Sequence, residues 1–318
     1  MAVYTHVSAE ALGEFLAGYD VGTLVSAKGI AEGVENSNYM VDTSTGRYFL
    51  TLYEKRVDAG DLPFFFALLD HLAARGLPVP RTLPDRGGVA IQTLSGRPAC
   101  LIEYLPGVSP SHPTIAQAQD VGAAMGRMHR AVADFAGTRA NSLGVDAWRP
   151  LLNRCGRDLD GIAPGLFATL DEGVDHVVAY WPRDLPTCVI HADLFPDNVL
   201  MLGDRVTGLI DFYFSCTDIR LYDLAVMHSA WSFDITGERY DAAVGDALMA
   251  GYDSAFGLTA ADRAAMPVLA MGACIRFALT RAWDWLNTPA DALVTRKDPL
   301  AYTRRLATYR DGGAGVFA

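Results

Sequence analysis

One short segment constrains the fold of this 318-residue chain more than any other, because an apolar run in it ends at a group of polar side chains. Residues 187–190 form the apolar run, and the loop that follows carries Asp193 and Asn198. A second apolar run then ends at Asp211. Helical patterns dominate the chain on both sides, so this segment is predicted to be a small β island in a helix-rich region.

A Gly-Asp turn inside this segment determines which of its polar groups meet. The turn predicts that residues 199–202 fold back against residues 206–210 as a hairpin. Because the two ends of a hairpin lie side by side, we expect Asp211 next to Asn198. A carboxylate and an amide oxygen suit Mg²⁺, which keeps water or phosphate oxygens as its other ligands.

Asp193 stays free of the metal in this arrangement, so its carboxylate can accept a proton from a hydroxyl group. A base beside a metal clamp is what in-line phosphoryl transfer from Mg-ATP requires. The segment therefore predicts a phosphotransferase in which Asp193 is catalytic and Asn198 and Asp211 are metal ligands.

Outside this segment, the sequence pattern changes from β-type to helical after about the first third of the chain. β-type runs at about 37–42 and 47–53 and a later run at 99–105 indicate a β-rich front, interrupted by one apolar helical stripe. Helical patterns dominate 114–180 and 220–310. We therefore expect an α+β protein of two lobes, with a β-rich N-terminal lobe at 1–104 and a mainly helical C-terminal lobe at 105–318.

Charge and cysteine content limit the partners of the chain. There are 26 Lys and Arg against 37 Asp and Glu, a net charge of −11, which disfavours binding to nucleic acid or to an anionic membrane surface. The five cysteines are far apart and show no zinc spacing, so neither a disulfide framework nor a structural metal site is indicated. We find no leader pattern and expect a soluble, cytoplasmic protein, of undetermined oligomeric state.

The polar segment also carries a family resemblance. The pattern His-x-Asp-x-x-x-x-Asn followed by Ile-Asp-Phe resembles the catalytic loop and metal aspartate of the aminoglycoside and choline phosphotransferases, small-molecule relatives of the protein kinases. Further stretches across nearly the whole chain resemble the bacterial homoserine kinases built on that fold. These stretches are residues 29–39, 49–56, 62–66, 191–199, 209–214 and 281–287.

The resemblance implies a protein-kinase-like fold and a specific activity. The enzyme would transfer the γ-phosphate of ATP to the side-chain hydroxyl of L-homoserine, giving O-phospho-L-homoserine, a step of threonine biosynthesis. ATP and Mg²⁺ would be the cofactors. The N-terminal lobe would bind the nucleotide, and the C-terminal lobe would carry the catalytic groups and the substrate site.

The resemblance also suggests where the nucleotide binds. The segment 29–38 contains no Gly-Lys pair and is not a P-loop, and from its residues alone a polar hairpin turn is an equally good interpretation. By resemblance it covers the ATP phosphates, where four residues are implied as contacts: Gly33, Asn36, Ser37 and Asn38. The strand that ends at Pro106 would present backbone groups near Glu103 and Leu105 to the adenine.

One position departs from the wider kinase pattern. Kinases of this shape carry a Lys on the third strand, paired with a Glu on the next helix, but the strand position is Thr51 and the helix position is near Phe65. Both charges are missing together, which avoids a buried unpaired charge. Thr51 is therefore implied at the nucleotide site, and Lys28 or Lys55 is a candidate for the missing phosphate contact.

The substrate and the support of the loop complete the predicted site. Arg281 and Asp284 lie three residues apart in a helical stretch, so they share a face and could bind the carboxylate and ammonium of homoserine; an ordinary surface ion pair is an equally serious interpretation. His191 is expected to brace the loop, and Asp223 to support it from below. Asp218 is expected to cap the next helix.

Three other functions remain open at this stage. A kinase of the same fold could act on another small alcohol, such as an aminoglycoside or choline. The missing Lys–Glu pair suggests a nucleotide-binding pseudokinase, although all three groups needed for the chemistry are present. A metal-dependent hydrolase would need a second metal-spaced histidine, which the segment lacks.

Overall fold

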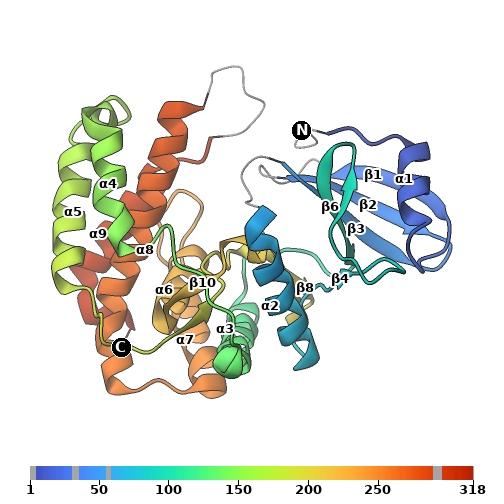
Figure 1. Ribbon diagram of the computed structural model, residues 1–318. Helices are drawn as coiled ribbons and strands as arrows, with labels where there is room; N and C mark the ends of the chain where they lie inside the picture. The colour runs from blue at the N-terminus through green and yellow to red at the C-terminus, as the bar shows by residue number, and fades with distance from the viewer. Residues whose placement is uncertain (1–4, 31–35, 55–58, 289–295, 318) are drawn as a thin grey trace. The chain divides into compact units, whose positions relative to one another are not determined.

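The computed structural model describes residues 5–30, 36–54, 59–288 and 296–317. The described chain divides into two compact units, an N-terminal unit that ends at Pro106 and a C-terminal unit that begins at Gly107. Figure 1 shows the β-sheet of the first unit and the helices of the second.

The N-terminal unit contains a six-stranded sheet in the order β1-β2-β3-β6-β4, with β5 on β6, and every described pair is antiparallel. Its elements are α1 (Ala9–Leu16), β1 (Leu24–Ile30), β2 (Asn36–Thr43), β3 (Arg47–Tyr53), α2 (Leu62–Ala74), β4 (Thr82–Leu83), β5 (Gln92–Leu94) and β6 (Arg97–Glu103). The runs predicted at 37–42 and 47–53 are β2 and β3. Strand β1 was missed, because its sequence does not alternate and its residues are mostly exposed.

Alternate residues of the central strands build the core of this unit. Val41 on β2, Leu50 and Leu52 on β3 and Leu101 on β6 belong to one buried cluster, and Leu12 of α1 packs into the same cluster. Side chains two apart on a strand point to one face, so this face of the sheet is the apolar one. The opposite face of β3 is also buried, which places Thr51 in a largely dry environment.

The C-terminal unit is mainly helical (Figure 1). Its helices are α3 (Ile115–Ala131), α4 (Val145–Cys155), α5 (Leu166–Tyr180), α6 (Arg220–Trp231), α7 (Ala242–Phe256), α8 (Ala260–Asn287) and α9 (Leu300–Gly312). Its strands are β7 (Thr187–Ile190), β8 (Val199–Leu202), β9 (Arg205–Leu209) and β10 (Cys216–Ile219). The α+β class, with a β-rich N-terminal unit and a mainly helical C-terminal one, is confirmed.

Helix α8 is the central helix of this unit and contacts α4, α5, α6 and α9. Among the described helices it alone is long and apolar enough to cross a membrane by length and composition, but 67% of its most apolar stretch is buried inside the structure. A helix that is apolar on most of its faces is what the core of a large helical unit requires.

Helices α3 and α7 approach each other closely because two glycines face the partner backbone. A Cβ at Gly122 of α3 would collide with the carbonyl oxygen of Leu248, and one at Gly251 of α7 with the carbonyl oxygen of Gln119. Neither clash can be relieved by a side-chain rotation, because both involve the backbone. The two glycines therefore fix the distance between the helices.

We expect Gly122→Ala to lower the free energy of unfolding by about 2 kcal/mol or more, because the added methyl group forces the helices apart. The matched change is Gly13→Ala on α1, where a Cβ meets nothing within 4 Å. There the gain in helix propensity should raise stability by up to about 1 kcal/mol. Thermal and urea unfolding of both variants measures the effect, and an unchanged midpoint for Gly122→Ala would contradict this packing.

The predicted β island consists of two short sheets. β8 and β9 form the expected hairpin, while β7 pairs antiparallel with β10, a strand that was not predicted. The expectation that Asp218 caps the following helix is wrong, since Ile219 occupies the N-cap position of α6. Asp218 lies in β10 instead, where its carboxylate accepts hydrogen bonds from the Asn141 amide and from the Ile219 N–H.

Candidate active site

The loop after β7 folds tightly around Asp193. Its preceding residue, Ala192, has a φ of 65°, in the left-handed region that costs a residue other than glycine about 1–2 kcal/mol. The Asp193 carbonyl then accepts hydrogen bonds from the Phe195 N–H at 2.8 Å and from Asn198 Nδ2 at 2.7 Å. The loop is thus closed by its own polar groups, and the Asp193 carboxylate is only partly exposed.

Asp223 holds the start of this loop from α6. Its carboxylate accepts hydrogen bonds from the backbone N–H groups of His191 and Ala192, each at 2.8 Å. It also bonds to Nε2 of His129 on α3, at 3.1 Å. Burial by itself would raise the pKa of Asp223, but the hydrogen bond from His129, together with the other neighbouring histidine, lowers it. An ionised carboxylate therefore anchors the loop in a fully buried position.

His191 connects the two halves of the site. Its Nε2 bonds to the carbonyl oxygen of Ile210 at 3.0 Å, and its Nδ1 accepts the Asp193 N–H at 3.2 Å. The side chain is completely buried, which lowers its pKa and favours the neutral ring. A neutral ring can donate from one nitrogen and accept at the other, as both bonds require.

The β8–β9 hairpin brings Asn198 and Asp211 to the same end. Val199 pairs with Leu209, and the N–H of Ile210 donates to the Asn198 carbonyl at 3.0 Å. Asp211 follows directly, with a φ of 64°. Of the three non-glycine residues with positive φ in the described chain, two, Ala192 and Asp211, lie in this segment. Such concentrated strain is typical of functional sites.

The donor set of this pair fits Mg²⁺. The Asn198 Nδ2 is occupied by its hydrogen bond to Asp193, so its oxygen is the amide atom left to bind a cation. Asp211 is exposed, so its carboxylate is accessible to a hard cation, which prefers oxygen ligands. No group of three or more His, Cys, Asp or Glu in the described residues could form a metal cage. Two oxygen ligands therefore leave the remaining positions to phosphate and water.

Helix α8 contributes an arginine that the sequence interpretation missed. Arg276 is 2% exposed, donates to the Ala192 carbonyl oxygen, and has its second terminal nitrogen 3.9 Å from Oδ1 of Asp193. The signal was present, because an Arg inside an apolar helical run needs a buried partner. The sequence does not show which partner it finds.

Arg281 lies five residues further along α8. Its guanidinium stands 4.5 Å from the ring centroid of Tyr302 and donates to the carbonyl oxygen of Asp298 at 3.2 Å. Burial lowers the pKa of this arginine, while the neighbouring Tyr302 and, further down the order of causes, Asp193 raise it. Asp284 is exposed on the same helix. Its neighbour Trp285 is 36% exposed.

The residues predicted to contact the nucleotide lie in the N-terminal unit, except that Gly33 and Lys55 fall outside the described residues. Residues 36–38, the end of the segment implied to cover the phosphates, form the start of β2, and the β-type run predicted at 37–42 already included Ser37 and Asn38. Thr51 donates to Oδ1 of Asn38 across the strand pair at 2.8 Å. The missing Lys–Glu pair is thus replaced by a neutral hydrogen bond on the strand and a buried Phe65 on α2.

The other predicted nucleotide residues occupy different environments. Ser37 is fully buried, and its hydroxyl donates to Glu54 Oε1 at 2.8 Å. Asn36 is buried as well, with its side-chain oxygen 3.4 Å from the Glu54 N–H. Glu103 ends β6, and its N–H donates to the Arg81 carbonyl at 2.9 Å. Leu105 lies in the irregular segment that follows this strand.

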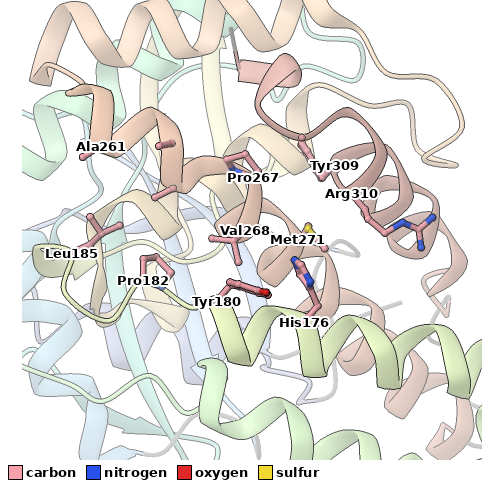
Figure 2. Close-up of a pocket in the computed structure, with 13 residues that line it drawn as sticks. His176, Tyr180, Pro182, Leu185, Ala261, Pro267, Val268, Met271, Tyr309 and Arg310 are labelled. Atoms are coloured by element: carbon pink, nitrogen blue, oxygen red, sulfur yellow. The ribbon is translucent and has the colours of Figure 1, made fainter.

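A separate hollow of about 600 Å³ is found in the C-terminal unit (Figure 2). It lies among α5, α8 and α9, and Figure 2 shows Tyr180, His176, Val268 and Met271 around it. None of its lining residues is among the predicted site residues.

Comparison with known proteins identifies the class. Residues 26–262 match the phosphotransferase enzyme family, and the chain belongs to this family. It is 52% identical to the homoserine kinase of Granulibacter bethesdensis, over 96% of each chain. It is 53% identical to that of Methylorubrum populi, over 98% of this chain and 96% of the other. The resemblance stated from the sequence is confirmed.

A solved structure supports the fold. The amicoumacin kinase hAmiN, in complex with AMP-PNP, Ca²⁺ and Ami, superimposes with a TM-score of 0.69, over 98% of this chain and 94% of the other. The two chains are 16% identical, so this likeness supports the fold and not the substrate.

Proposed function

We propose that this protein transfers the γ-phosphate of ATP to the side-chain hydroxyl of L-homoserine, giving O-phospho-L-homoserine and ADP. The observation that carries this function is the identity of more than half of all aligned residues with homoserine kinases over nearly the whole chain. Use of ATP follows from the phosphotransferase family. Other acceptors, such as aminoglycosides or choline, are characteristic of more distant members of the fold.

Asp193 serves as the base in this proposal. The homoserine oxygen forms a bond to the γ-phosphorus while the bond from that phosphorus to the bridging oxygen of ADP breaks. The hydroxyl proton passes to the Asp193 carboxylate and from there to solvent. A base positioned in this way contributes typically 10²- to 10⁴-fold to a proton-transfer step.

Asn198 and Asp211 hold Mg²⁺ in this proposal. When bound, the ion neutralises charge on the phosphate oxygens during transfer. The two side chains supply it with oxygen ligands from adjacent ends of one hairpin. His191 and Asp223 act beneath them as supports, because they bind the backbone of the loop through the hydrogen bonds described above.

The N-terminal lobe, residues 1–104, binds the nucleotide, and residues 105–318 carry the catalytic groups and the amino-acid site. Asn38 and Thr51 share a hydrogen bond on neighbouring strands and present one polar spot on the sheet. Backbone groups from Glu103 to Leu105 meet the adenine. Of the two candidate lysines, Lys28 on β1 lies in the described part of the chain, where it is exposed.

Arg281 binds the carboxylate of homoserine, and Asp284 its ammonium group. A protein of net charge −11 must concentrate positive charge locally to hold an anion, and α8 carries Arg276 and Arg281 within one stretch of helix. The planar guanidinium suits a carboxylate because it can donate two parallel hydrogen bonds.

We expect Arg281→Met to raise the KM for homoserine by about 10- to 100-fold. A loss of affinity of this size corresponds to the free energy of one hydrogen bond to a charged group. The KM for ATP should stay nearly unchanged. The matched control is Arg304→Met on α9, since Arg304 also reaches Asp298 but is an exposed surface residue. Steady-state kinetics with each substrate varied in turn measures both constants. If Arg281→Met raises the KM for homoserine and the KM for ATP equally, Arg281 supports the fold and does not bind homoserine.

The acceptor is tested directly by ADP release from the wild-type protein. The assay compares homoserine with serine, threonine, choline and kanamycin at equal concentration. We expect homoserine to give the highest kcat/KM. A higher kcat/KM for kanamycin or choline would show that the acceptor is another small alcohol and not homoserine. ATP binding without turnover of any acceptor would show that the protein is a pseudokinase.

The cytoplasm is the compartment we propose for this enzyme. All five cysteines are free, and burial raises the pKa of Cys100 and of Cys216 to about 12. Buried thiols without disulfide partners suit a reducing compartment. ATP is also available there.

A further inference from the structure

A buried arginine from α8 contacts the same loop that Asp223 holds from α6. The Arg276 side chain is 97% buried, and its guanidinium donates to the carbonyl oxygen of Ala192 through one terminal nitrogen. Its other terminal nitrogen lies 3.9 Å from Oδ1 of Asp193. A buried guanidinium requires polar partners, and two consecutive residues of the loop supply oxygen atoms for it.

The residue that Arg276 holds is the strained one. Ala192 has a φ of 65°, a conformation that persists only when its surroundings impose it. On one side, its N–H is bound by Oδ1 of Asp223 at 2.8 Å. On the other side, its carbonyl oxygen is bound by Arg276. The two peptide groups next to the Ala192 Cα are therefore fixed by two ionised side chains from different helices.

The same guanidinium also reaches the segment after Asp211. Its carbon lies 5.6 Å from the ring centroid of Phe214 and 4.5 Å from that of Phe277. Phe214 ends the short 3₁₀ turn that follows Asp211. Arg276 thus contacts both the loop that carries Asp193 and the turn that follows Asp211. It can therefore fix the position of one segment relative to the other.

We propose that Arg276 is a positioning residue for phosphoryl transfer, which holds Ala192 in its left-handed conformation and thereby directs the Asp193 carboxylate toward the acceptor hydroxyl. The proposal rests on the role of Asp193 in the proposed function. Without the guanidinium, the Ala192 carbonyl loses its donor and the loop is free to relax. A displacement of about 1 Å in a reacting group can reduce the rate about 100-fold.

The first test compares Arg276→Met with Arg305→Met. Arg305 is also buried in the C-terminal unit, donates to the carbonyls of Ser229 and Asp234, and contacts no residue of the loop among its described partners. We expect Arg276→Met to lower kcat about 100-fold with little change in the KM for ATP. Arg305→Met should lose stability but keep its kcat per folded molecule. Equal losses of kcat in both variants would overturn the proposal.

A conservative variant keeps the test decisive if Arg276→Met folds poorly. Arg276→Lys retains the charge, but one ammonium group cannot reproduce the planar fork that donates to Ala192 and faces Asp193 together. We expect its kcat to fall about 10-fold, with the melting temperature close to that of the wild type. A wild-type kcat in this variant would show that the fork has no role.

Hydrogen exchange separates this proposal from the proposed function. The amides of residues 188–198 should exchange faster in Arg276→Met and Arg276→Lys than in Arg305→Met, measured by mass spectrometry on the full chain without substrate. If the wild type fails to phosphorylate homoserine, the proposed function is wrong, and exchange still decides whether Arg276 holds the loop. Unchanged exchange in both Arg276 variants would overturn the inference whatever the substrate.

Discussion

Replacing Asp193 by Ala is expected to reduce kcat for homoserine phosphorylation about 10³-fold, because the hydroxyl loses the group that takes its proton. The nucleotide affinity should change little, since Asn198 and Asp211 remain in place at the end of the hairpin. Coupled ADP release measures the rate, and titration with a fluorescent ATP analogue measures binding. A kcat within tenfold of the wild-type value would show that Asp193 is not the base that accepts the hydroxyl proton.

Asp197 provides the control for this result. It lies on the same loop and carries the same charge, but its side chain is exposed. We expect Asp197→Ala to keep kcat within about threefold, as most exposed substitutions do. A comparable loss in both variants would indicate that the loop has collapsed in each, and circular dichroism and melting temperature would reveal this.

Replacing Asp211 by Asn is expected to raise the Mg²⁺ concentration needed for half-maximal rate by about 10- to 100-fold, because a hard cation loses its charged ligand. The substitution keeps the size of the side chain, and asparagine tolerates the left-handed conformation found at this position. The measurement is the rate of ADP release against Mg²⁺ at fixed ATP. A titration curve equal to that of the wild type would refute the metal role.

Asp204→Asn is the matched change at the opposite end of the same hairpin. Asp204 is exposed in the turn and accepts a hydrogen bond from the Thr114 hydroxyl at 3.3 Å. The variant removes the same charge without touching the predicted metal site. Its Mg²⁺ dependence should equal that of the wild type.

Local patterns predicted the hairpin and the approach of its two ends. Residues 199–202 pair with the antiparallel partner strand through a short turn, which fixes the register next to the turn, and a bulge between Met201 and Leu200 shifts it by one residue toward the end of the hairpin. The supports of the loop were also accessible by resemblance, and the structure places Asp223 under His191 and Ala192. The chemistry assigned to these groups stays a prediction until the variants above are measured.

The N-terminal unit was less accessible from its sequence. β1 is an exposed strand without alternation, and its assignment depends on pairing with β2. The segment 29–38 was open to interpretation as a polar hairpin turn, whereas a β-type run was predicted only from residue 37. Residues 36–38 begin β2, where Asn38 pairs with Thr51 through both backbone and side chain. Pairing with β3 therefore sets where this strand begins.

The sequence by itself determined the class of the protein, the polar loop and the hairpin, because these depend on residues close together in the chain. Only the tertiary structure decided which arginine reaches Asp193. Arg276 and Ala192 are 84 positions apart, and the helical pattern of α8 offers Arg276 and Arg281 as equivalent cations in one apolar helix. The packing of that helix against the loop distinguishes them, because a buried guanidinium is stable only where carbonyl and carboxylate oxygens surround it.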